Sequence, residues 1–456
     1  MSPPEGASPA VERAIGRDSV ETVAFKVFAY ASLMGTGILL ARRLGPEGAG
    51  VLAVLLALLQ TLEQAGNLGL PTANVYFLAK RPDRAAAVAG NAVVAPLLVG
   101  ATLALVLFAA RGFVADTFLG GANGGLVVVV LWLLPFRFLE SNLYSLLRGA
   151  RRFRLWNLFQ AASPALDFAA LFVTIGLLGG GVAAAVAVRT ALGTAQCLVL
   201  FLVVRRAVPV SLGLDRPLLR ETFSFGLKTY LQVLASYLHH KVDVWFIAAL
   251  VGTADVAYYA AAVGYTTLAW FVPDSIGLVL LPRLVTLERR EIHRLVAFAT
   301  RCAFFVLALA CAASVLLAPL LVPFLYGARF APAVPVVPIL AIGILTMSVG
   351  KILFRNFTSQ ARQTVNVVAG AVSLGANVLL NCLLVPAFGI AGAAAATAVS
   401  YTLSSSILLA RFRKDSGLPL AAVFVPTSED LSAFFSALAP KLSPFRRKAR
   451  AGLSRR

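Results

Sequence analysis

Long apolar stretches separated by short polar breaks dominate this chain from about residue 22 to residue 411. Each stretch has the length of about 20 residues that a helix needs to cross the hydrocarbon core of a bilayer. The pattern predicts twelve spans, at residues 22–41, 49–70, 86–110, 125–147, 155–178, 182–204, 224–250, 255–282, 296–325, 333–355, 364–387 and 391–411. The predicted fold class is an all-α polytopic membrane protein with about twelve transmembrane helices.

Glycine-containing joins recur along the chain at a nearly constant spacing, which predicts an internal repeat. The offset is 207 residues in two pairs of landmarks and about 210 in a third. The pairs are LGPEGAGVLA from Leu44 with VGTADVAYYA from Val251, Gly120 with Gly327, and GGGVAAAVAV from Gly179 with FGIAGAAAAT from Phe388. Because corresponding spans run in the same direction, we expect two parallel six-helix repeats around a central cavity.

The repeat divides the chain into five predicted parts. They are a cytoplasmic N-terminal segment (1–20), an N-terminal six-helix bundle (21–206), a cytoplasmic linker (207–222), a C-terminal six-helix bundle (223–412) and a basic cytoplasmic tail (413–456). The first twenty residues lack the charged-then-apolar order of a cleaved signal peptide, so the first span is expected to act as an uncleaved signal.

Composition supports a membrane protein, since 59% of the residues are hydrophobic and 13% are charged, against roughly half and a quarter in soluble domains. The net charge of +20 would suggest a nucleic-acid partner in a soluble protein. Here, with the N-terminus inside, 17 basic residues fall in inner loops and four in outer loops. Basic loops face the cytoplasm, so we expect an inner (plasma) membrane protein with both termini cytoplasmic and no nucleic-acid partner.

Three segments carry a resemblance to a known family. ARRLGPEGAGVLAVLLALLQTLEQAGNLGLPTANVYFLAK (41–80) resembles the opening signature of bacterial polysaccharide-export flippases in the multidrug/oligosaccharidyl-lipid/polysaccharide (MOP) superfamily. FGLKTYLQVLASYLHHKVDVWFIAALVGTADVAYYAAAVGY (225–265) is similar to the seventh and eighth helices of that family. ANVLLNCLLVPAFGIAGAAAATAVSY (376–401) is similar to its eleventh and twelfth. The resemblance extends from about residue 20 to residue 411 and depends on order and spacing.

The resemblance implies a transporter that flips an undecaprenyl-pyrophosphate-linked oligosaccharide from the cytoplasmic to the outer leaflet by alternating access, and no enzyme. Its expected partners are membrane lipids, the lipid-linked glycan and glycan-assembly proteins, with the oligomeric state open. Two alternatives are a multidrug or cation antiporter of the same superfamily and an integral-membrane glycan polymerase or ligase. The antiporter would favour an acidic cavity, and the polymerase would need a catalytic outer loop that residues 111–124 do not supply.

Charged residues inside the spans are candidates for the site, because burying one at the bilayer centre costs about 2.5 kcal/mol or more. The candidate cations that bind the substrate phosphate bidentately or as point charges are Arg137, Arg189, Lys241 and Arg301. The candidate acids, for proton or sodium coupling or for pairing with cations, are Glu63, Glu140, Asp167, Asp243 and Asp274. Lys26, Lys228 and Lys351 add to a surplus of two in-span cations, which suits an anionic ligand.

Several in-span charges have a simpler interpretation. Lys26, Lys228, Arg301 and Lys351 lie near the inner ends of their spans, from where they can extend to lipid headgroups. Arg137 and Glu140 are three residues apart and can pair on one helix face. Arg189 has no acid in its own span. The tail (413–456) can lie on anionic headgroups or serve only to fix topology.

Cofactor signatures are missing from the sequence. Three histidines, with His239 and His240 adjacent and His293 distant, do not make a metal site, and the glycine runs lack a phosphate-loop GK[ST]. The four cysteines lie in apolar segments without CxxC spacing and are interpreted as small core residues. We expect no cofactor apart from a coupling proton or sodium ion.

Overall fold

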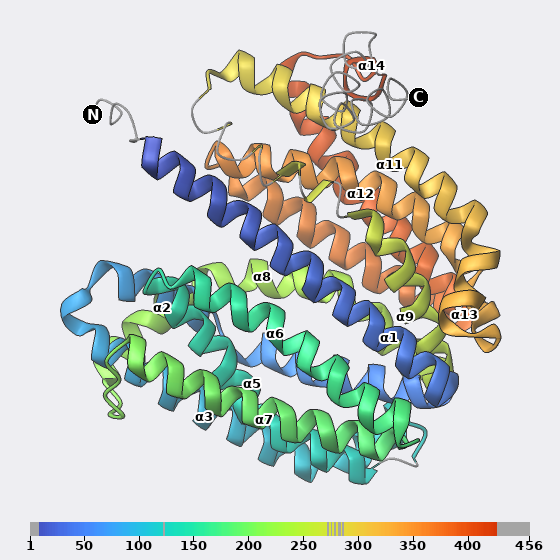
Figure 1. Cartoon of the computed structure of the whole chain (residues 1–456). Coiled ribbons are helices and arrows are strands. Elements are labelled where there is room, and N and C mark those ends of the chain that lie inside the picture. Colours follow the sequence, from blue (N-terminus) through green and yellow to red (C-terminus); the bar gives the residue numbers. More distant parts are fainter. Residues whose placement is uncertain are drawn as a thin grey trace, which may run out of the picture. The chain divides into compact units, whose positions relative to one another are not determined.

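A computed structural model describes residues 9–121, 124–270, 273, 274, 276, 277, 280, 284 and 287–425. Within these ranges the chain forms helices and no strand. The elements in chain order (Figure 1) are α1 (Pro9–Gly66), α2 (Leu70–Lys80), η1 (Pro82–Arg84), α3 (Ala85–Ala109), α4 (Arg111–Phe118), α5 (Gly124–Gly149), α6 (Phe153–Leu171), η2 (Phe172–Leu177), α7 (Val182–Ala207), α8 (Arg216–Leu250), α9 (Thr253–Thr267), η3 (Leu268–Trp270), α11 (Arg289–Tyr326), η4 (Ala328–Ala333), α12 (Val336–Ser359), α13 (Gln363–Ser416) and α14 (Ala421–Phe424).

The helices confirm the predicted fold class. In the described part of the chain, eight helices are long and apolar enough to cross a membrane. Two of them, α1 and α13, each cover two predicted spans; α8 covers the seventh span, and α9 covers the first part of the eighth. The end of the predicted eighth span, from residue 271, lies largely outside the described residues, as does most of the tail from residue 426 onward.

Glycine bends the two longest helices at the joins between predicted spans. Gly45 in α1 has φ 70° and precedes Pro46, and Gly389 in α13 has φ 55°. Positive φ is accessible to glycine because it lacks a Cβ atom. The other landmark glycines, 120, 179, 252 and 327, also have positive φ. Both helices therefore turn where the sequence pattern places a loop, while the two-repeat organisation stays a prediction.

The chain forms two compact units. The first comprises residues 1–261, 321–333 and 381–393, and the second comprises residues 262–320, 334–380 and 394–456. In the first unit, α5 packs against α3 and α7, and α1 packs along α6 (Figure 1). A buried core there joins α2, α3, α5 and α7 through residues such as Leu143, Leu147 and Leu200. The predicted boundaries at residues 206 and 223 stay a prediction.

The second unit has its own core. Val296 of α11, Leu353 of α12 and Phe412 of α13 are fully buried members of one cluster there. Among the cysteines, Cys197 and Cys311 are buried, as predicted, and Cys302 is half-buried. Cys382 is exposed, so its interpretation as a core residue was wrong. It lies on the apolar outer surface of α13, where a weakly polar thiol is tolerated.

Large apolar side chains cover the outer surface of the helices. Leu105 of α3, Trp132 of α5 and Leu316 of α11 are 71%, 65% and 79% exposed. An aqueous protein rarely exposes apolar patches of this extent, whereas lipid tails solvate them. The outer surface is therefore the one expected for helices in a bilayer.

A close backbone approach at Gly50 gives a test of the packing. A Cβ atom there would lie 1.8 Å from the carbonyl oxygen of Thr253 at the start of α9. We expect Gly50→Ala to destabilise the protein by about 1–3 kcal/mol, as overpacking does, and to lower its thermal midpoint in detergent. Gly37→Ala on the same helix is the control, because a Cβ atom there meets no atom within 4 Å. Equal midpoints for the two variants would contradict the close approach of Gly50 to Thr253.

Candidate functional site

Arg137 of α5 lies between two carboxylates inside the first unit. Its Nη1 is 2.5 Å from Oε2 of Glu140, and its Nη2 is 3.3 Å from Oε2 of Glu63 on α1. Glu140 is buried and Glu63 is half-buried. Arg137 therefore contacts one carboxylate on its own helix and a second one on α1. The three charges sum to minus one, so Arg137 adds no free positive charge.

Asparagines extend this polar region, and the sequence analysis missed them. Asn142 of α5 donates to Oδ1 of Asn67, 3.0 Å away, and accepts from Nδ2 of Asn74, 2.8 Å away. All three are buried. Buried amides need such partners, and interhelical amide bonds stabilise membrane bundles. The sequence carries the signal as asparagines near the ends of apolar spans.

Arg189 of α7 and Asp167 of α6 form a bidentate ion pair. Nε lies 3.1 Å from Oδ1, and Nη2 lies 2.8 Å from Oδ2. Helix α7 contains no acid, so the partner of Arg189 comes from the neighbouring helix α6. Asp167 is thus paired with a base on a neighbouring helix.

Lys351 of α12 and Asp274 are paired in the second unit. Lys351 Nζ lies 3.0 Å from each carboxylate oxygen and 4.2 Å from the ring centroid of Trp270. Both charged residues line a cavity of about 290 Å³, together with Arg355. The ammonium group of Lys351 is therefore held by the carboxylate of Asp274.

Lys241 and Asp243 are two residues apart on α8 but differ in their surroundings. Asp243 is 3% exposed and accepts hydrogen bonds from the Tyr259 hydroxyl and from Asn381 Nδ2, both at 2.8 Å. Lys241 is half-buried and has no acidic partner among the described residues. Lys241 is thus an in-span cation whose charge the described acids leave uncompensated.

The remaining in-span cations are Arg301, Lys26 and Lys228. Arg301 of α11 donates from Nη1 to the carbonyl oxygen of Ala422 at the start of α14. Lys26 of α1 is exposed, as expected for a side chain that reaches headgroups. The side chain of Lys228 lies outside the described residues.

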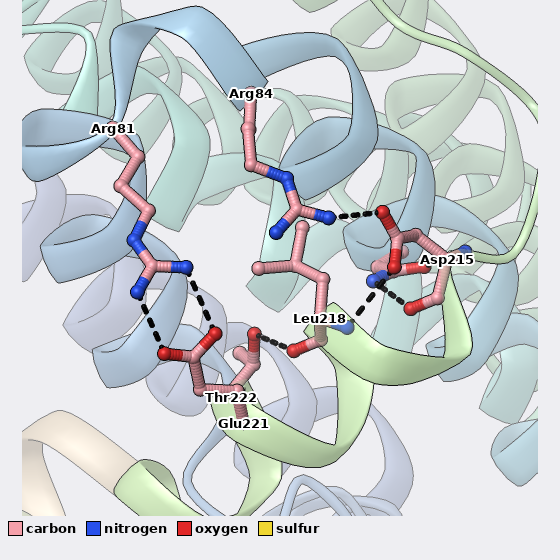
Figure 2. Close-up of polar contacts among 7 residues, drawn as sticks. Arg81, Arg84, Asp215, Leu218, Glu221 and Thr222 are labelled. Atoms are coloured by element: carbon pink, nitrogen blue, oxygen red, sulfur yellow. Dashed lines mark hydrogen bonds and ion pairs between the residues drawn. The ribbon is translucent and has the colours of Figure 1, made fainter.

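A further charged cluster joins the end of α2 to the start of α8 (Figure 2). Arg81 donates to both carboxylate oxygens of Glu221, at 2.9 and 2.7 Å, and Arg84 Nη2 lies 2.5 Å from Asp215. Asn91 of α3 exchanges two hydrogen bonds with the Asp215 backbone. The predicted linker (207–222) is therefore tied to α2 and α3.

The charge pattern predicts only the side of the membrane on which these basic residues lie, so it does not predict their pairs. The available signal was that Arg81 and Arg84 and the acids Asp215 and Glu221 were predicted on the same side of the membrane. Which acid meets which base depends on the helix packing, which the sequence pattern does not specify.

Hydrogen bonds shift the pKa values in this cluster. Asp215 caps α8, accepting from the Leu218 N–H at 3.0 Å, and that bond together with Arg84 lowers the pKa of its carboxyl group. The hydrogen bond and the charge of Glu221 raise the pKa of Arg81. Asp215 is therefore ionised at neutral pH, as its ion pair with Arg84 requires.

Comparisons with known proteins agree with these observations. A family described as "Polysaccharide biosynthesis protein" matches residues 17–288. The succinoglycan biosynthesis transport protein ExoT of Rhizobium meliloti (strain 1021) is 27% identical over 318 residues, which cover 68% of this chain and 62% of that protein. The matched regions of the curated relatives span 38% and 62% of those proteins' own lengths.

Two solved structures have a similar fold. The lipid II flippase MurJ in an inward closed conformation has a TM-score of 0.74 at 14% identity, covering 88% of this chain and 90% of that chain. A multidrug resistance MATE family transporter of the MOP superfamily, in an inward-facing conformation, has a TM-score of 0.69 at 17% identity, covering 85% and 94%. At these identities the likeness concerns the fold.

The Asp215 cap gives a pH-dependent test. Its carboxyl pKa is lowered in the folded protein, so the stabilisation is present above the ordinary pKa of 3.8 and is lost as the pH falls through the folded value. We expect Asp215→Ala to lower the thermal midpoint at pH 7, with a gap to wild type that narrows at acidic pH below 3.8. Asp215→Asn, which still caps a helix, should lower the thermal midpoint less. A gap independent of pH would contradict the assignment.

Proposed function

This chain belongs to the polysaccharide biosynthesis protein family, and from that premise we propose that it flips a lipid-linked oligosaccharide across the membrane. It is a membrane protein with the fold of MOP superfamily transporters. The proposed cargo is an undecaprenyl-pyrophosphate-linked oligosaccharide, a repeat unit of a polysaccharide. The proposed direction is from the cytoplasmic to the outer leaflet by alternating access. The likeness to a succinoglycan biosynthesis transport protein supports a glycan cargo.

Lys241 is the observation that carries the proposal. An ammonium group held half-buried in a predicted span is unfavourable without a counter-charge, and the described acids supply none. A pyrophosphate headgroup would provide that counter-charge in a region of weak screening. The apolar polyprenyl tail can remain in the lipid, so the protein needs to shelter only the charge and the sugar.

The other predicted cations take secondary roles in this proposal. Arg137 and Arg189 are already paired with carboxylates, so each would exchange an acid for phosphate when the substrate passes. Arg301, which donates to a backbone carbonyl, is a further candidate. Since a phosphate must compete with these existing partners, we assign the first contact to Lys241.

Asp243 is the proposed site of ion coupling. It is buried and accepts hydrogen bonds from Tyr259 and Asn381. A buried carboxylate can bind a proton or a sodium ion in exchange for substrate movement. Asp167 and Asp274 are each matched by a base, and Glu63 and Glu140 share Arg137, so these four are better suited to charge pairing.

Removing the Lys241 charge tests the substrate site. We expect Lys241→Gln to reduce glycan export about tenfold or more, the effect of losing a charge-assisted hydrogen bond, and Lys241→Arg to retain most of it. Export is measured by complementing a strain deleted for this gene and quantifying the lipid-linked glycan left in the inner leaflet. Lys26→Gln, at an exposed cation, is the control for net charge.

Two results would contradict the proposal. One is full export by Lys241→Gln at the wild-type protein level. The other is a deletion strain that accumulates no lipid-linked glycan and instead becomes sensitive to toxic cations, which would favour a multidrug antiporter.

Neutralising Asp243 tests the coupling. We expect Asp243→Asn, which keeps the shape and can still hydrogen-bond, to leave the protein folded but to lower gradient-driven export about tenfold or more, because the binding charge is gone. The measurement is export in vesicles under an imposed proton or sodium gradient. Asp116→Asn on α4, at an exposed acid, is the control. An unchanged response to both gradients would exclude Asp243 as the coupling site.

A further inference from the structure

A cavity of about 590 Å³ lies between the end of α2 and the start of α8. Its charged lining consists of Lys80, Arg81, Arg220 and Glu221. Three bases and one acid give this lining a net charge of plus two. The cavity lies outside the groups assigned above to transport.

The charges in the cavity are not equally available. Arg81 binds Glu221 through two hydrogen bonds, so these two neutralise each other (Figure 2). Lys80 donates to the Tyr76 hydroxyl at 2.7 Å, a neutral partner. Arg220 is exposed and has no acidic partner among the described residues. Lys80 and Arg220 therefore offer two positive charges to an anion.

Aromatic rings form the rest of the wall. Tyr76 stacks on Phe225 with ring centroids 4.5 Å apart and an interplanar angle of 15°, and Phe77 meets Phe225 edge-on at 5.7 Å. All three rings line the cavity. A free phosphate gains nothing from such a wall, whereas a lipid places apolar carbons beside its phosphate. The combination of two bases with aromatic rings suits a lipid headgroup better than a soluble anion.

The predicted location of the cavity agrees with this ligand. Lys80 and Arg220 flank apolar spans on the predicted cytoplasmic side, where anionic lipids attract basic residues. We infer that the cavity between α2 and α8 binds the phosphate-bearing headgroup of an anionic phospholipid, with Lys80 and Arg220 as its phosphate ligands. This inference is independent of the proposed transport function.

Lipid binding to the purified full-length protein tests the inference. The measurement is native mass spectrometry of the protein in neutral detergent with phosphatidylglycerol, phosphatidylcholine or inorganic pyrophosphate. We expect wild type to bind phosphatidylglycerol in preference to the other two. Lys80→Gln with Arg220→Gln should weaken that binding about 25-fold, since each of the two cations near a membrane surface contributes about fivefold.

Two further variants make the test specific. Glu221→Gln should strengthen phosphatidylglycerol binding, because it releases Arg81 and raises the charge of the lining. Arg205→Gln with Arg216→Gln removes the same charge from exposed positions outside the cavity and should leave binding unchanged. If the double cavity variant does not fold, the single exposed change Arg220→Gln replaces it.

Three outcomes would overturn the inference. Equal weakening by the Arg205 and Arg216 control pair would show that general surface charge attracts the lipid. Equal binding of phosphatidylcholine would show that charge does not select it. Pyrophosphate bound as tightly as phosphatidylglycerol would assign the cavity to a soluble phosphate. Transport is not measured, so a failure here leaves the proposed flippase function untouched.

Discussion

The bilayer offers no water to a polar group, and most features of this protein follow from that constraint. Backbone groups within the hydrocarbon must bond inside their own segment, which leaves helices as the structure for long apolar spans. Charged side chains must find counter-charges on neighbouring helices. Arg189 with Asp167 and Lys351 with Asp274 are such pairs. Each pair also holds two helices together, because a lone partner would be strongly disfavoured in lipid.

Close packing between helices depends on the same constraint. Lipid tails are as apolar as leucine, so helices associate through contact and hydrogen bonds more than through the hydrophobic effect. Gly50 against the Thr253 carbonyl and Gly69 against the Gly226 carbonyl let backbones approach within the first unit. Buried asparagines on α2 and α5 add bonds between helices. Small residues and amides thus stabilise a bundle whose outer surface stays apolar.

Charge compensation also separates residues that stabilise the fold from those available for function. Most of the described in-span cations pair with acids or donate to backbone carbonyls, so they are less available to bind a substrate. Lys241 differs, because the described acids leave its charge uncompensated. The proposed substrate contact rests on this difference. Lys80 and Arg220 likewise have no acidic partner in the part of the chain that the structure describes, whereas Arg81 pairs with Glu221.

The hydrophobic pattern by itself determined the helices, the bends at Gly45 and Gly389 and the fold class, because span length and glycine conformation are local properties. It also identified the charged residues that cannot face lipid. Only the tertiary structure decided the partners. Arg189 has no acid in its own span, and its partner Asp167 lies 22 positions earlier on another helix. Arg81 pairs with Glu221 across 140 positions. Pairing between helices depends on their rotation and register, which side chains far apart in sequence establish together and no local pattern contains.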